Sequence, residues 1–337
     1  MQGLPNDNGL FMPENIPDHS KLVRGISELS FQDISYVISK SMLSDDFSNS
    51  EIEDIIDKSI TFDSPLINIV DNIYVLELFH GPTLAFKDFG ARFMAQTMKK
   101  VVSDNDKELN ILVATSGDTG SAVANGFYGV EGINVIILYP SQKVSYIQEK
   151  QLTTLDKNVY ALEIQGTFDD CQKLVKQAFL DKELKNYLDI SSANSINIDR
   201  LIPQSFYYFN AYSKLNKSKK NAVSVPSGNF GNLTAGFLAK KMGLPINQFI
   251  ASTNSNKTVP EYLKTKQYIL SKSIETISNA MDVGNPSNMK RIMDIYVNVD
   301  NLKNNLLAFS FNDDETKKII KNVFSKTDYL LDPHSAV

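Results

Sequence analysis

The fold is indicated first by a short segment, residues 80–90, which reads HGPTLAFKDFG. An apolar run from Tyr74 to Phe79 precedes it and is typical of a β-strand. A glycine–proline pair ends that strand, and Thr83 is a residue type that caps helices. The apolar residues that follow recur at helical spacing: Phe86, Phe89, Phe93, Met94 and Met98. This order of strand, tight turn and amphipathic helix predicts an α/β unit.

Lys87 lies in the first turn of the predicted helix. A cation there faces the positive end of the helix dipole, which favours the neutral amine. A neutral lysine amine is what Schiff-base chemistry needs. Taken alone, a solvated surface lysine is the commoner case, because most lysines are exposed.

Short apolar strands alternate with amphipathic helices along the rest of the chain. The expected strands are 112–114, 135–139, 160–164, 223–225 and 249–251. This alternation predicts an α/β fold with mostly parallel sheets flanked by helices. Residues before about 60 read as helical instead, with Ser30 as a cap and apolar faces at Phe31, Ile34, Val37, Ile38, Ile52, Ile55 and Ile56. We predict a helical segment at 1–60, an α/β domain at 61–213 and a second α/β domain at 214–337.

Two further turns follow predicted strands. Residues 114–121, ATSGDTGS, place small hydroxyl residues and glycines at a helix start, where N–H groups pointing outward would bind an anion. Residues 225–234, VPSGNFGNLT, have spaced glycines that allow close backbone approach to a phosphate. The second turn is neither a Walker loop nor a dinucleotide fingerprint. For each turn, a plain structural role is the alternative.

Composition excludes several classes of function. The net charge of −5 gives no electrostatic reason to expect nucleic acid or anionic lipid as a partner. A single cysteine, Cys171, rules out an internal disulfide and suits a reducing compartment. The three histidines show no metal-ligand spacing, and no apolar run is long enough to span a membrane. We therefore expect a cytoplasmic protein with no metal and no membrane or nucleic-acid partner.

Taken together, these segments resemble the threonine synthases, which are pyridoxal-phosphate (PLP) enzymes related to the tryptophan synthase β subunit. The matching blocks occur in family order at residues 76–89, 114–120, 192–197, 224–232 and 279–286. The resemblance implies the tryptophan synthase β-like fold (fold type II) and PLP as cofactor. It also implies that O-phosphohomoserine and water are converted to threonine and phosphate.

The resemblance further implies roles for single residues. Lys87 matches the lysine that holds PLP as an internal aldimine and then serves as the base for the substrate Cα proton. The residues that match the cradle of the PLP phosphate are Gly228, Asn229, Phe230, Gly231 and Asn232. Those that match the turn near the substrate carboxylate and cofactor ring are Ser116, Asp118 and Thr119. Candidates for the substrate phosphate are Asn194, Ser195, Asn197 and Arg200.

Several alternatives stay open at this point. Sibling enzymes carry asparagine where Asp118 stands, so a contact from Asp118 to the cofactor O3′ is undecided, and Arg200 also suits a structural ion pair. A threonine dehydratase, a cysteine synthase or an inactive PLP-binding fragment is the alternative function, and the protein is either a monomer or a homodimer. Family members begin before the GLPNDNGL text at residues 3–10 and continue beyond residue 337. We therefore expect an extended chain to be the better catalyst.

Overall fold

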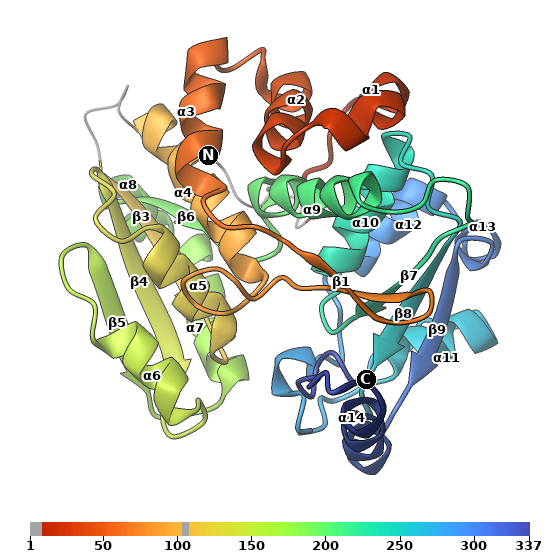
Figure 1. The fold of residues 1–337 in the computed structure, drawn as a ribbon. Coiled ribbons are helices and arrows are strands. Elements are labelled where there is room, and N and C mark those ends of the chain that lie inside the picture. Colours follow the sequence, from red (N-terminus) through yellow and green to blue (C-terminus); the bar gives the residue numbers. More distant parts are fainter. Residues whose placement is uncertain (1–8, 103–107) are drawn as a thin grey trace. The chain divides into compact units, whose positions relative to one another are not determined.

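The structure is a computed structural model that describes residues 9–102 and 108–337. The chain forms two compact units, each built from three separate stretches (Figure 1). The first unit takes the described residues up to Pro13, then Glu28–Pro65 and Glu77–Asn210, and the second takes Glu14–Ser27, Leu66–Leu76 and Ala211–Val337. Because neither unit is one continuous stretch, the linear division at residues 60 and 213 stays a prediction. Most of the GLPNDNGL text, residues 3–8, lies outside the described residues.

The first unit is centred on a parallel sheet of four strands in the order β5-β4-β3-β6. Its strands are β3 (Leu109–Ala114), β4 (Ile133–Pro140), β5 (Val159–Ile164) and β6 (Asp189–Ser192). Side chains alternate between the faces. Ile111 and Val113 pack with helices α4 (Lys87–Val102) and α5 (Asp118–Gly126), whereas Leu112 and Ala114 pack with α7 (Phe168–Leu180). Both faces are thus covered, as expected for a parallel sheet.

The expected N-terminal helices are present in the first unit. Helix α2 (Phe31–Leu43) starts at a capping box of Ser30 and Asp33, and α3 (Asn49–Ser59) starts at one of Ser48 and Glu51. Each box satisfies backbone N–H groups that have no partner within the helix. The isoleucines of both helices face the core: Ile34, Ile38, Ile52, Ile55 and Ile56. Helices α6 (Tyr146–Thr153) and α8 (Lys182–Tyr187) complete this unit, and α9 (Ile202–Ser213) spans its boundary with the second unit.

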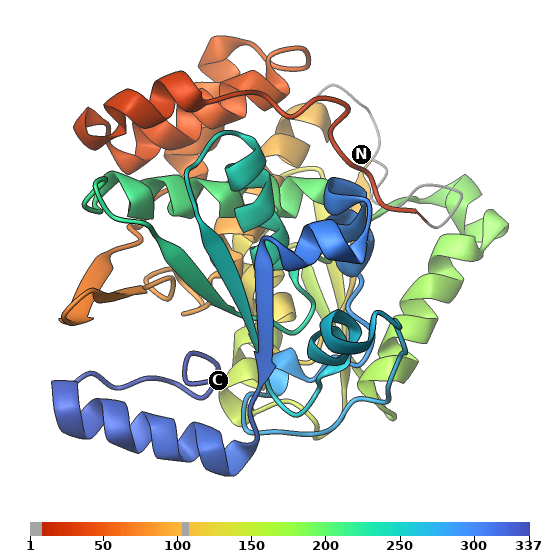
Figure 2. The ribbon, with the colours of Figure 1, turned by 90° about the vertical axis from the view of Figure 1, so that its right-hand side faces the viewer.

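The second unit holds a parallel sheet of three strands, β7 (Ala222–Pro226), β8 (Gln248–Thr253) and β9 (Leu306–Ser310). Figure 2 shows these strands and the long helix α14 (Asp313–Thr327), drawn in dark blue, which follows β9. The remaining helices of this unit are α1 (Ser20–Gly25), α10 (Gly231–Lys241), α11 (Thr258–Thr265), α12 (Met289–Tyr296) and α13 (Val299–Lys303). Within the described ranges, no helix is long and apolar enough to cross a membrane.

The strand predicted from Tyr74 to Phe79 is wrong in extent and partner. The observed strand β2 (Ile73–Leu76) pairs antiparallel with β1 (Leu66–Val70) and joins neither parallel sheet. A tight turn at Asp71 connects them, and Asp71 has a positive φ of 44°. An apolar run alone does not distinguish a hairpin strand from a strand of a parallel sheet.

Candidate active site

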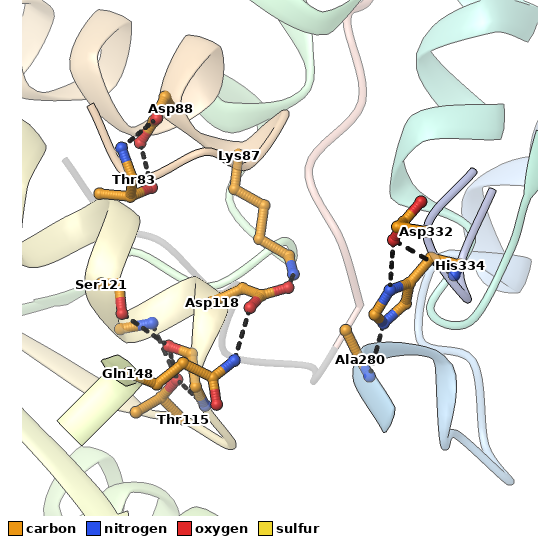
Figure 3. A network of polar contacts seen from close by, with 12 residues as sticks. Thr83, Lys87, Asp88, Thr115, Asp118, Ser121, Gln148, Ala280, Asp332 and His334 are labelled. Atoms are coloured by element: carbon orange, nitrogen blue, oxygen red, sulfur yellow. Dashed lines mark hydrogen bonds and ion pairs between the residues drawn. The ribbon is translucent and has the colours of Figure 1, made fainter. Parts of the chain in front are cut away.

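Helix α4 begins at Lys87, so the prediction that Thr83 caps it is wrong. The Thr83 hydroxyl instead donates to Asp88 Oδ1 at 2.6 Å, and its backbone N–H donates to Asp88 Oδ2 at 2.8 Å (Figure 3). Burial raises the pKa of the Asp88 carboxyl, while the Thr83 bonds and the charges of Arg92 and Arg200 oppose that rise. These two hydrogen bonds fix the turn immediately before Lys87. The turn also contains Leu84 at a φ of 59°, a conformation that non-glycine residues rarely adopt.

The lysine side chain meets two polar residues in the first unit. Lys87 Nζ donates to Asp118 Oδ2 at 3.0 Å, with the two side chains 16% and 29% exposed. The other carboxylate oxygen, Asp118 Oδ1, accepts from Gln148 Nε2 at 2.7 Å (Figure 3). Gln148 was not predicted from the sequence. A signal was available, because Ser145-Tyr146-Ile147-Gln148 has capping-box spacing after β4, which neighbours the strand that leads to Asp118.

The turn before α5 is built around Thr115. Its Oγ1 accepts from the N–H of Gly117 at 3.0 Å and of Gly120 at 2.8 Å. The expectation that the N–H groups of this turn point outward is therefore wrong for these two glycines. Ser116 is exposed and Thr119 is half-buried, and their side chains have no hydrogen-bond partner in the part of the chain that the structure describes. These two hydroxyls are the groups of the turn that remain available to a ligand.

The segment after β6 contains the four predicted contacts to a substrate phosphate. Arg200 is buried, its Nη1 donates to Ala193 O at 2.6 Å, and burial lowers the pKa of its guanidinium to about 10 although Asp88 opposes this. Asn197 is also buried; it caps the 3₁₀ turn Ile198–Arg200 and donates to Ser192 O at 3.2 Å. These contacts favour a structural role for both residues. Ser195 is half-buried.

Two polar atoms in this segment lack partners. Among the described residues, Asn194 Oδ1 and Arg200 Nε are buried and form no hydrogen bond. Buried polar groups are nearly always paired, so such atoms mark a place where a ligand or water can bind.

The glycine-rich turn of the second unit leads from β7 into α10. Phe230 is the N-cap at a φ of 61° and is buried. The backbone N–H groups of Gly228, Phe230 and Gly231 find no acceptor within the described residues, and they precede a helix N-terminus. Such groups suit a phosphate. Asn229 is used differently, since its Oδ1 accepts from the backbone N–H of Ser287 at 2.7 Å and from its hydroxyl at 2.9 Å. Asn232, the last predicted residue of this turn, is half-buried.

Residues outside the glycine turn support it. A Cβ at Gly228 would lie 2.5 Å from Met281 Cα, so the turn packs directly on the backbone of residues 279–281. The carboxylate of Asp282 fixes that backbone, accepting from Asn254 at 2.9 Å and from the Thr276 hydroxyl at 2.7 Å. On its other side, the Ala280 N–H donates to Nε2 of His334 at 3.2 Å (Figure 3). The family block at residues 279–286 is thus a support for the glycine turn.

Comparison with known proteins decides the family. A family model described as "Threonine synthase N terminus" matches residues 1–60, and one described as "Pyridoxal-phosphate dependent enzyme" matches residues 63–337. A threonine synthase of Haemophilus influenzae is 47% identical over 338 residues, which are 100% of this chain and 79% of that relative. The chain belongs to the threonine synthase family.

Solved threonine synthases have the same fold. The crystal structure of the Escherichia coli threonine synthase has a TM-score of 0.92 at 44% identity, covering 100% of this chain and 78% of that chain. A PLP-bound threonine synthase of Brucella melitensis has a TM-score of 0.93 at 34% identity, covering 99% and 79%. The predicted family, the PLP enzyme fold and the dependence on PLP are confirmed.

The described residues fit this cofactor on their own chemistry. The first unit offers the amine of Lys87 beside the carboxylate of Asp118, and a lysine amine is the group that forms a Schiff base. The second unit offers backbone N–H groups without acceptors at a helix start, which is the group that binds a phosphate.

Proposed function

We propose that this chain converts O-phosphohomoserine and water to threonine and phosphate. The observation that carries the proposal is the contact of Lys87 with Asp118, in a chain that belongs to the threonine synthase family. PLP, when bound, supplies an electron sink for the carbon chemistry. The protein contributes attachment, orientation and proton transfer.

In this proposal Lys87 has two tasks. Its Nζ would hold the cofactor covalently, and as a free amine it would accept the proton from the substrate Cα. Asp118 Oδ2, 3.0 Å from Nζ, accepts a hydrogen bond from the amine and so orients it.

The other predicted residues divide by what surrounds them. We propose that the hydroxyls of Ser116 and Thr119 bind the substrate carboxylate, since both are accessible and lack partners in the described chain. The turn from Gly228 to Asn232 holds the cofactor phosphate through its backbone. For the substrate phosphate we retain Asn194 and Ser195, whereas Asn197 and Arg200 shape that segment from inside the fold.

The attachment point has a direct test. Borohydride reduction of the PLP-loaded protein, followed by peptide mapping, should place the pyridoxyl group on Lys87. The Lys87→Ala variant should lose turnover and the reducible adduct while keeping its thermal stability. A pyridoxyl group on any other lysine would contradict the assignment.

The reaction is tested by offering substrates of the sibling enzymes in parallel. We expect phosphate release from O-phosphohomoserine together with threonine formation. Production of 2-oxobutyrate from threonine would instead indicate a dehydratase, and consumption of sulfide with an activated serine a cysteine synthase. Absence of all three activities in a PLP-loaded protein would refute the proposal.

A further inference from the structure

The two oxygens of the Asp118 carboxylate have separate partners. Oδ2 accepts from Lys87 Nζ at 3.0 Å, and Oδ1 accepts from Gln148 Nε2 at 2.7 Å. Gln148 is thirty residues further along the chain and lies in the first turn of α6. A residue in another helix therefore determines which way this carboxylate faces.

The amide of Gln148 is held in one orientation. Its Oε1 accepts from the Ser145 N–H at 3.1 Å, as part of the capping box that starts α6. Exchanging the amide oxygen and nitrogen would place an oxygen against Asp118 and leave the Ser145 N–H facing a donor. Gly117, which has a φ of 139°, lies against the same amide, and a Cβ at that position would collide with it. The packing against Gly117 thus confines the amide, and its two hydrogen bonds set the orientation in which Nε2 faces Asp118.

We propose that Gln148 is a positioning residue that holds the Asp118 carboxylate as a hydrogen-bond acceptor facing Lys87. The inference rests on the proposed role of Lys87 as the cofactor lysine. With the amide donor on Oδ1, the carboxylate keeps Oδ2 toward the amine and is stabilised as a charge acceptor. Among the described residues no hydrogen bond joins Gln148 to Lys87, so Gln148 acts through Asp118.

Two variants separate the capping role of Gln148 from its positioning role. Gln148→Glu retains an acceptor for the Ser145 N–H, and glutamate is a regular member of capping boxes, but it puts a carboxylate where Asp118 needs a donor. Ser145→Ala removes the capping hydroxyl and leaves the Gln148 amide in place. We expect Ser145→Ala to lower the melting temperature without affecting the reactivity of Lys87. We expect Gln148→Glu to change the reactivity of Lys87 with little effect on the melting temperature.

The readout is the reactivity of the Lys87 amine in protein free of cofactor. Limited acylation with acetic anhydride at pH 8 is followed by mass spectrometry of the peptide that carries Lys87, with exposed Lys143 as the internal reference. In Gln148→Glu, the second carboxylate repels Asp118 and turns Oδ2 away from the amine, so acylation of Lys87 should speed up about threefold to tenfold relative to Lys143. Gln148→Met, which has no donor and no charge, loses the bond that holds Asp118 in place and should give a smaller increase in the same direction. It serves if the glutamate variant does not fold.

Coupling to Asp118 completes the test. In an Asp118→Asn background, Gln148→Glu should have no further effect on Lys87, because the group through which it acts is gone. Unchanged Lys87 acylation in both Gln148 variants, with the pyridoxyl group still mapped to Lys87, would overturn this inference and leave the proposed function standing. A pyridoxyl group on another lysine would overturn the proposed function instead.

Discussion

A methyl group at position 228 tests how the glycine turn is built. In Gly228→Ala the new Cβ would lie 2.5 Å from Met281 Cα and 3.1 Å from both Met281 C and Cβ. Carbon atoms normally approach to about 3.5 Å, so the two backbones must separate by about 1 Å. Overpacking of this kind costs about 1–3 kcal/mol. The upper part of that range is expected here, because the neighbouring Ser278 and Asp282 are both hydrogen-bonded to Asn254.

The turn is the side that should move, which displaces the N–H groups that we propose as the binding site of the cofactor phosphate. If the turn must return to its strained position to bind PLP, the affinity for PLP falls about tenfold for each 1.4 kcal/mol of strain. The assay is a titration of cofactor-free protein with PLP by absorbance, alongside thermal unfolding. Gly25→Ala is the matched control in the same unit, since nothing lies within 4 Å of a Cβ there. Equal PLP affinity and equal melting temperature in the two variants would refute the reasoning.

Two further predictions concern other parts of the fold. Thr83→Val removes the hydroxyl that donates to buried Asp88, so it should lower the free energy of unfolding by about 1–3 kcal/mol and weaken PLP attachment to Lys87. Thr83→Ser should restore both, as measured by denaturant unfolding and borohydride trapping. A valine variant as stable as the natural protein would contradict the role of the Thr83–Asp88 hydrogen bonds. Burial lowers the pKa of His19 despite the opposing charge of Asp18, so its contribution to stability is present above the unfolded pKa of about 6.5 and is lost as pH falls through the folded value. The natural protein should therefore lose more melting temperature between pH 7.5 and 5.5 than His19→Gln, and parallel curves for the two proteins would count against this.

Local signals in the sequence were sufficient where the structure depends on near neighbours. The capping residue Ser30 and the apolar faces of α2, α3 and α4 lie where the helical spacing put them. The apolar runs of β3 and β4 were found because both strands are buried on two faces. Strand β6, which reads DISS, has no such signal, because only its pairing with β3 makes it a strand.

The candidate site was predictable in its central residue and less so in its surroundings. Lys87 and Asp118 came from motifs, and the structure joins them by a hydrogen bond. The partner of Asp118, by contrast, is set by the packing of α5 and α6. The capping-box spacing of residues 145–148 predicts a helix start but not a contact with Asp118. The same holds for Arg200, whose burial against Ala193 depends on how the segment after β6 folds back.

The interleaved order of the two units has a consequence for biosynthesis. Residues Glu14–Ser27 and Leu66–Leu76 leave the ribosome long before Ala211–Val337, with which they form the second unit. At about 5–20 residues per second, the hairpin waits on the order of ten seconds before the last and longest stretch of its unit begins to emerge. Until then the hairpin lacks the residues with which it forms a compact unit, so chaperone binding should matter in this interval of translation.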